Sequence, residues 1–416
     1  MTFYQEWATQ FRSYNRNIRL ALLGSTFIQI GMGIFMVIYN FYIRELGYSE
    51  QVNGQIISMN SLATALILIP AGLLSDRLGR KKVMLLGASF TGALLIFRSI
   101  TDVQSLLILS AFLTGLTMAF LMVSGIPWLA ENSTEAQRVH LFSMQFAVMT
   151  GANVIGNILG GTLTDLFSLR FTEVESIRFT LLIGAFIFLL GIFPMTKFKE
   201  IQKTKTNSKS LIKESQKTKN KYIMIILFAI PALLVGFGAG LVIPYLNLYF
   251  SDRFAASNTT VGIIISMGQA ATAIAIIIGP VVVRKIGEVR AVVFLQLMSL
   301  PFLLLTAYTE HLWLAAVGFL FRQALMNAGN PIQTSLMMSM VDDSVKGLAN
   351  SVNQMVFNLG WALMGPVSAG IVVKYGTYWG YATVFSITAS LYLIGSVYYY
   401  IVFSKINGER RLKSAV

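Results

Sequence analysis

The residue with the most distinctive chemistry is Arg322, which lies inside a long apolar stretch. A guanidinium near the centre of a bilayer costs at least about 2.5–3.5 kcal/mol, so it must face a cavity or a partner. Helical spacing places it on one face with Met326, Asn330, Gln333 and Met337. This face could bind an anionic group of a substrate or couple to a proton-carrying acid. The structural alternative is that Arg322 holds carbonyls or amides of neighbouring helices.

Amide, methionine and aromatic side chains recur at helical spacing in several other apolar stretches. They are Gln29, Met36, Asn40, Gln145, Asn153, Tyr245, Asn247, Gln354, Asn358 and Trp361. Such side chains suit a moderately polar, adaptable pocket. We therefore expect the set to line a central cavity, although an interhelical hydrogen bond explains any one amide equally well.

Proton transfer would need an acid, and no Asp or Glu lies in the middle of an apolar stretch. The candidates are Asp165, near the outer end of its stretch, and Glu131, at the inner end of another. Either could carry a proton. The alternative is that the activity of the protein is not coupled to protons.

Enzymatic chemistry has little support. The chain has no cysteine and only two histidines, His140 and His311, which excludes thiolate metal sites, disulfides and cysteine nucleophiles. No phosphate-binding G-x4-G-K-[ST] loop is present, so an ATP-driven pump is excluded. We expect no cofactor, no metal and no enzymatic activity.

The composition indicates a membrane protein. Of 416 residues, 55% are hydrophobic and 12% are charged, and the mean hydropathy is +0.67. Soluble domains carry about 25% charged residues, so a soluble protein and a nucleic-acid binder are excluded despite the net charge of +14. Stretches of about 20 apolar residues can span a bilayer. We expect twelve all-α spans at 19–43, 52–75, 83–101, 105–129, 139–164, 178–196, 222–250, 259–283, 291–308, 312–340, 348–373 and 379–404.

The basic residues predict the orientation in the membrane. Most of the 32 lysines and arginines fall on one side if both termini lie in the cytoplasm. We expect a multi-pass protein of the inner membrane in which residues 19–196 and 222–404 form two six-helix bundles. Residues 197–221 would be a basic cytoplasmic linker and 405–416 a tail. Residues 1–18 would be an amphipathic lead-in on the membrane surface or a disordered tail.

The two halves of the sequence resemble each other. At a constant offset of 208, identical pairs include Gly54/Gly262, Ser58/Ser266, Met59/Met267, Thr64/Thr272 and Gly79/Gly287. Six spans repeated in parallel are typical of secondary transporters, whose binding site lies between the halves near the bilayer midplane.

The loop after the second span resembles the cytoplasmic signature G-x-x-x-D-[RK]-x-G-R-[RK]-[RK] of the major facilitator superfamily. It carries Gly72, Asp76, Arg77, Gly79, Arg80, Lys81 and Lys82. The resemblance implies a twelve-helix transporter in which this loop latches the halves on the cytoplasmic side and stabilises the outward-open state. Asp76 would then lie near the positive N-terminal end of the helix that begins near Leu348. The basic residues would pair with acids such as Glu131, Asp342 or Asp343.

The fifth span is similar to the motif G-x4-G-P-x-x-G-G of the family's drug/proton antiporters. It carries Gly151, Gly156, Gly160 and Gly161, with Asn157 where that motif has proline. The structural alternative is close helix packing by small residues. Ala111 also replaces an arginine of the fourth span that the family's antiporters use in proton coupling.

Two functions follow as expectations. The first is proton-coupled efflux of small amphipathic compounds by alternating access. The second is import or exchange of a small anionic metabolite bound by Arg322. For either function we expect a monomer that works in a lipid bilayer and binds a small-molecule substrate. Proton-coupled efflux would have protons as a further partner.

Overall fold

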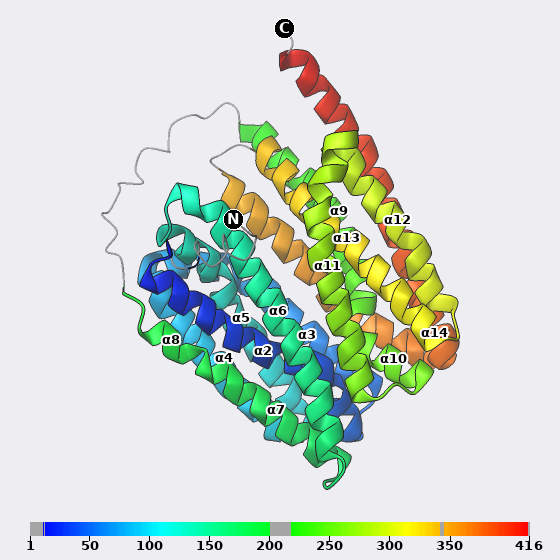
Figure 1. The fold of residues 1–416 in the computed structure, drawn as a ribbon. Coiled ribbons are helices and arrows are strands. Elements are labelled where there is room, and N and C mark those ends of the chain that lie inside the picture. Colours follow the sequence, from blue (N-terminus) through cyan, green and yellow to red (C-terminus); the bar gives the residue numbers. More distant parts are fainter. Residues whose placement is uncertain (1–10, 12, 200–217, 342–344, 415–416) are drawn as a thin grey trace, which may run out of the picture.

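The computed structural model describes residues 11, 13–199, 218–341 and 345–414, and every regular element within them is a helix (Figure 1). This confirms the all-α architecture. The first half of the chain contains α2 (Arg16–Glu45), α3 (Glu50–Leu78), α4 (Arg80–Ile100), α5 (Gln104–Glu131), α6 (Glu135–Phe167), α7 (Glu173–Leu190) and α8 (Ile192–Thr196).

The second half contains α9 (Thr218–Val242), η2 (Ile243–Tyr245), α10 (Leu246–Phe254), α11 (Asn258–Ile286), α12 (Glu288–Tyr308), α13 (Leu312–Met340) and α14 (Lys346–Ser414). Pro244 lies in η2, where it divides the helix that was predicted over 222–250. Since proline has no backbone N–H, it interrupts the ladder of helical hydrogen bonds. The long element α14 consists of two arms, because Gly376 breaks its helical path with a φ of 75°.

The helices are long enough to cross a membrane. Among the described residues, ten helical segments have the required length and hydropathy, and one of them, Leu348–Ile406, contains both arms of α14. The α13 helix is not among the ten, since Arg322, Gln323, Asn327 and Asn330 make its middle polar. Counting both arms of α14 and adding α13 gives the twelve predicted spans.

Two glycines turn the chain at equivalent points of the two halves. Gly79 connects α3 to α4 with a φ of 95°, and Gly287 connects α11 to α12 with a φ of 82°. An L side chain is strained at such angles, whereas glycine adopts them freely. The offset of 208 between these residues therefore reflects the same sharp turn in each half.

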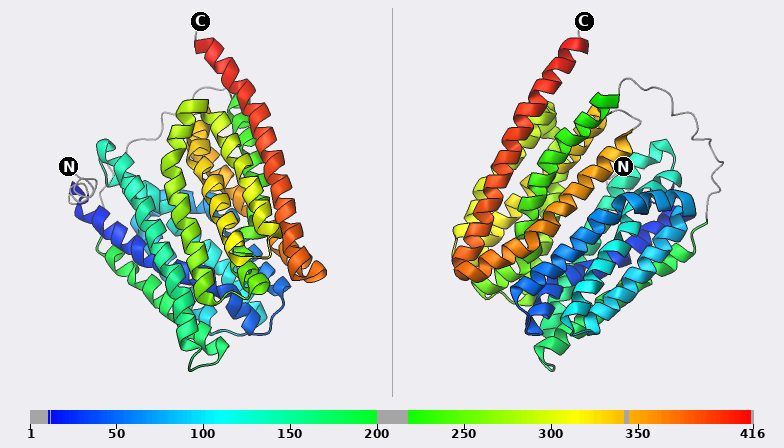
Figure 2. Two further views of the ribbon diagram at one scale, coloured as in Figure 1. Left: turned by 45° about the vertical axis from the view of Figure 1, so that its right-hand side comes forward. Right: turned by 180° about the vertical axis from the view of Figure 1, so that it is seen from behind.

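The halves lie side by side, with their helices running up and down between two ends (Figures 1 and 2). We name the end that carries residues 199 and 218, between which the linker runs, the linker end. The opposite end, which carries the turns at residues 46–49 and 255–257, is named the far end. The halves meet through α3 against the first arm of α14 and through α6 against α11.

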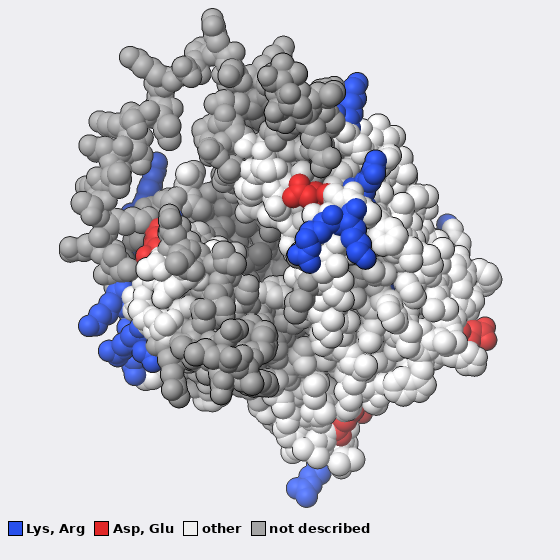
Figure 3. Space-filling view, turned by 45° about the horizontal axis from the view of Figure 1, so that its top comes forward, with Lys and Arg blue, Asp and Glu red and all other residues white. Residues whose placement is uncertain are grey.

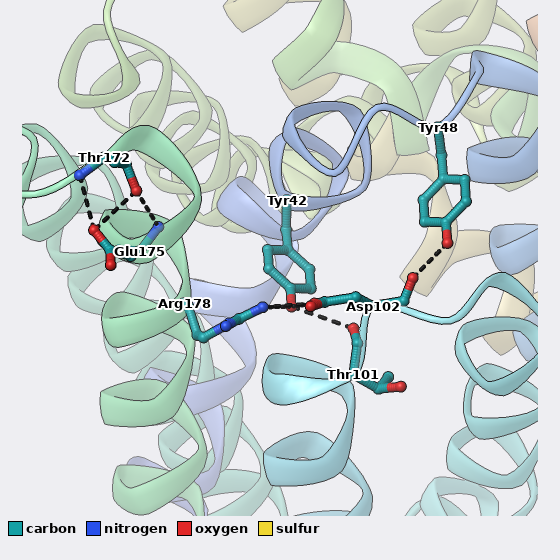
Figure 4. A network of polar contacts seen from close by, with 7 residues as sticks. All are labelled: Tyr42, Tyr48, Thr101, Asp102, Thr172, Glu175 and Arg178. Carbon is teal, nitrogen blue, oxygen red and sulfur yellow. Dashed lines mark hydrogen bonds and ion pairs between the residues drawn. The ribbon is translucent and has the colours of Figure 1, made fainter.

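A polar network fixes the far end of the first half (Figure 4). Arg178 of α7 forms an ion pair with Asp102 at an N···O distance of 2.5 Å. The Tyr42 hydroxyl of α2 lies 3.1 Å from the same carboxylate and 3.2 Å from the Thr101 carbonyl, and the Tyr48 hydroxyl donates to the Asp102 carbonyl. The network thus joins α2 and α7 to the turn between α4 and α5.

Candidate functional site

The two halves are joined at the far end by a set of polar contacts that we name the outer seal. Its centre is a pair of asparagines, one from each half. Asn40 of α2 donates to the side-chain oxygen of Asn247 at 2.9 Å and to the Pro244 carbonyl at 2.5 Å. Asn247 in turn donates to the Val37 carbonyl at 2.7 Å. Both asparagines were predicted to line a cavity, and the structure places them in the seal beside it.

An ion pair lies next to these asparagines. Arg44, near the end of α2, pairs with Asp252 of α10, whose second oxygen accepts a hydrogen bond from the Tyr381 hydroxyl at 3.2 Å. The pair escaped the sequence analysis, which singled out neither of the two residues. The signal that could have found it is the offset of 208, because residues 44 and 252 occupy equivalent positions of the repeat.

Asp165 joins α6 to the start of α11. One carboxylate oxygen accepts from the Asn258 side chain at 2.9 Å, and the other accepts from the Thr259 backbone N–H at 2.8 Å. A carboxylate is favoured at a helix N-terminus, where unpaired N–H groups carry partial positive charge. The residue predicted as a proton carrier is therefore a helix cap that spans the two halves.

Close backbone contacts complete the outer seal. A Cβ added at Gly161 of α6 would collide with the Asn258 backbone, and one at Gly262 of α11 would collide with the Asn157 carbonyl. Gly156 and Gly160 pack in the same way against α2, whereas Gly151 borders open space. Most of the glycine motif of α6 thus permits close packing, and the transport role suggested by its resemblance stays a prediction.

The contacts that join the halves by hydrogen bonds lie toward the far end. Those formed by Asn40, Arg44, Ser58, Asp165, Asn247 and Ser266 all come from the far half of the helices. Seen from the linker end, the surface is hollowed between the halves, and Lys and Arg side chains gather around that end (Figure 3). The far end is therefore closed between the halves, and the surface at the linker end is hollowed.

Several predicted cavity residues lie on the linker side of the outer seal. Met36 of α2, one helical turn from Asn40, is 42% exposed, and Gln354 on the first arm of α14 is exposed. Asn358 donates to the Gln354 carbonyl at 2.9 Å. The partly buried members of the predicted set are Gln29, Gln145, Asn153, Asn358 and Trp361, while Asn330 is exposed and Tyr245 is buried.

Arg322 is enclosed within the second half and is 3% exposed. Its guanidinium donates to the Gln323 side chain at 2.8 Å and to the Tyr392 hydroxyl, on the second arm of α14, at 2.7 Å. Met326, one turn further, is buried and its sulfur lies 3.9 Å from the Ser299 hydroxyl. The structure thus places the Arg322 and Met326 part of this face of α13 against its own bundle, and a role in the cavity stays a prediction.

The loop with the predicted latch signature is held by its own half. Arg80 forms an ion pair with Glu131 at 2.8 Å, one of the acids expected to face the loop, and Lys81 donates to the Phe198 carbonyl at 2.6 Å. Gly72 borders open space, and Arg77 and Lys82 are exposed. The side chain of Asp76 and residues 342–344 lie outside what the structure describes.

Metal chemistry has no support in the described residues, where no three His, Cys, Asp or Glu side chains are close enough to hold an ion. The arrangement instead offers a space between the halves, which we name the chamber. The outer seal closes it at the far end, and it opens toward the hollow of Figure 3.

Known proteins resemble this chain over nearly its whole length. The family model of the Major Facilitator Superfamily matches residues 21–231 and 228–415. Multidrug resistance protein MdtG of Proteus mirabilis is 26% identical over 406 residues, which cover 94% of this chain and 96% of that protein. Multidrug resistance protein 1 of Bacillus subtilis is 24% identical over 88% of this chain and 94% of its own length.

Solved structures share the fold at low sequence identity. The nucleoside transporter NupG superposes with a TM-score of 0.75 at 17% identity and covers 94% of this chain and 100% of that one. A bacterial homologue of the human lysosomal transporter Spinster, in an inward-facing and occupied conformation, gives a TM-score of 0.76 at 14% identity. It covers 92% of this chain and 95% of its own.

Proposed function

The chain belongs to the major facilitator superfamily, and on that premise we propose that it exports small amphipathic compounds by alternating access, driven by proton entry. It is a multi-pass membrane transporter and not an enzyme. The relatives at about 25% identity are named multidrug resistance proteins, which supports efflux as the direction and amphipathic compounds as the substrates.

The observation that carries the proposal is the contrast between the two ends. Alternating access requires a site that opens to one side while the other side is closed. The outer seal supplies the closed side, and the hollow at the linker end supplies the open one (Figure 3). The seal consists of single hydrogen bonds, one ion pair and close backbone contacts at glycines, all of which separate without unfolding either half.

The linker end is the cytoplasmic end in this proposal. Basic residues favour the cytoplasmic side of a membrane, and Lys and Arg gather at that end. The structure then corresponds to the inward-open state, in which the transporter receives its substrate. The signature loop at Asp76 would contact the other half only after the cytoplasmic side closes, and so would stabilise the outward-open state.

Asp165 is the acid that best suits coupling to protons. Its two hydrogen bonds cross from one half to the other, so its protonation state would change the stability of the outer seal. Glu131, in contrast, pairs with Arg80 of its own half. A carboxylate that caps a helix across the interface therefore links proton binding to the conformational change.

Import or exchange of an anionic metabolite is the second candidate. It requires Arg322 to reach the substrate, and two of its three nitrogens donate to Gln323 and Tyr392. The enclosure of this side chain favours the efflux proposal over the anion proposal.

The test is transport in everted membrane vesicles energised by a proton gradient. Wild-type protein should move an amphipathic dye in a gradient-dependent manner, and Asp165→Asn should lose this dependence while Glu131→Gln keeps it. A vector control sets the background. Dye movement equal to that background, with the protein verified in the membrane, would refute efflux; equal coupling in both variants would refute the role of Asp165.

A further inference from the structure

The charge of the transported compound can be inferred from the groups that border the chamber. When the two arms of α14 are counted as separate helices, Arg322 is the only Asp, Glu, His, Lys or Arg in the middle third of a described helix. The other described residues of these types lie in the outer thirds of their helices or in turns. The middle of the molecule therefore depends on Arg322 for any fixed charge.

Arg322 does not present its charge to the chamber. The side chain is 3% exposed, and its guanidinium is held by Gln323 and Tyr392, both from the second half. The guanidinium also lies 5.5 Å from the centre of the Tyr392 ring, which is packed against Gly238 of α9. A substrate between the halves would have to displace these contacts to reach the arginine.

The described side chains that follow the contacts of the outer seal by one or two helical turns toward the linker end include amides and methionines and no charged group. On α6, Asn157 contacts α11. Asn153 lies one helical turn away on the same face, and Met149 lies one turn further. On α14, the Ala362 carbonyl accepts a hydrogen bond from Ser58 of the first half, and Asn358 and Gln354 follow it at one and two helical turns. On α2, Met36 lies one turn from Asn40. Amides and methionines offer hydrogen bonds and polarisable surface, and no counter-charge.

A substrate ion would be poorly stabilised in such a chamber. Burying an ionised group without a partner costs several kcal/mol or more, while a neutral polar group needs only hydrogen bonds. We propose, on the basis of the proposed efflux function, that the transported compounds are uncharged amphipathic molecules with hydrogen-bonding groups. Lipophilic cations and organic anions are excluded from the chamber because the described side chains at mid-depth offer no counter-ion.

The test uses three probes on one scaffold. N-phenyl-1-naphthylamine is neutral, 8-anilino-1-naphthalenesulfonate adds a sulfonate, and a trimethylammonium derivative adds a cation. Cells are loaded while de-energised, and efflux is followed by fluorescence after energy is restored. We expect the neutral probe to leave at least about tenfold faster than from vector cells, and the two charged probes to leave at the vector rate.

The outcomes separate the two proposals. Efflux of either charged probe at a rate equal to or above that of the neutral one would overturn the uncharged-substrate inference and leave efflux standing. Efflux of none of the three, with the protein verified in the membrane, would overturn both. Binding to purified protein, followed as a rise in thermal stability, provides an independent readout and should rank the probes in the same order.

A carboxylate placed in the chamber should change the selectivity. Gln354→Glu adds a negative charge at an exposed position of α14 with little change of volume. We expect this variant to gain efflux of the trimethylammonium probe by about tenfold or more. The matched control is Gln104→Glu, at the exposed start of α5 on the far end, which should change nothing. A wild-type protein that already moves the cation as fast as the variant would contradict the inference.

Discussion

Replacing Asp252 with asparagine removes the anionic partner of Arg44 from the outer seal. The two side chains are 31% and 21% exposed, so the pair lies between a surface ion pair, which contributes about 0–1 kcal/mol, and a buried one, whose disruption costs about 3–5 kcal/mol. A loss of about 1–2 kcal/mol is therefore expected. It corresponds to an increase of about 5–30-fold in the population with an open far end.

The assay exploits the absence of cysteine from the chain. Ser266→Cys introduces a single thiol at a position that is 3% exposed, where the native hydroxyl donates across the interface to the Val154 carbonyl at 3.1 Å. A membrane-impermeant maleimide added from outside should label this thiol only when the far end opens. The labelling rate should rise about 5–30-fold when Asp252→Asn is added.

Two controls define the result. Glu173→Gln removes a carboxylate at the same end, from the exposed first turn of α7, and should leave the labelling rate unchanged. The double exchange of Arg44→Asp with Asp252→Arg should bring the rate back toward that of the parent. An unchanged rate in Asp252→Asn would refute the role of this ion pair in closing the far end.

Four further changes test other parts of the account. Asp165→Asn should weaken the cap of α11 by about 1 kcal/mol and abolish gradient-driven transport; normal pH-driven transport would exclude the residue from coupling. Gly161→Leu should prevent the far end from closing, because a side chain would collide with the Asn258 backbone, and labelling of Ser266→Cys should rise with loss of transport; unaltered labelling would contradict this packing. Arg178→Ala should remove the ion pair with Asp102 from the network of Figure 4 and lower the melting temperature in detergent by about 2–4 °C for each kcal/mol lost; a melting temperature equal to that of wild type would show that this ion pair contributes little. Asp76→Asn should slow turnover with normal membrane insertion, and a wild-type turnover rate would exclude the latch role.

The fold follows closely from the sequence because a bilayer leaves few alternatives. Each span must satisfy its backbone hydrogen bonds internally, so a stretch of about 20 apolar residues becomes a helix. The glycines at 79 and 287 mark the same turn in both halves, and the repeat predicts that the halves pack as equivalents. The division of the seventh span at Pro244 depends on packing, and the sequence indicates only that a kink lies nearby.

The candidate site is harder to predict, since a helical face does not reveal which neighbour it contacts. Arg322 and Asn40 both satisfied the rule that a polar group inside the membrane needs a partner. The partner of Arg322 proved to be Tyr392 in its own bundle, whereas that of Asn40 is Asn247 in the other half. Asp165 was singled out by its charge alone, and its position as a cap of α11 depends on the assembly of both halves.

The most direct test of the central claim is substrate-induced proton movement in proteoliposomes. Purified protein is reconstituted with a pH indicator trapped inside, the interior is made acidic, and N-phenyl-1-naphthylamine is added outside. Exchange of substrate for protons predicts a loss of internal acidity that requires the protein, saturates with substrate and disappears in Asp165→Asn. Substrate binding by the same protein without any proton movement would contradict proton-coupled alternating access.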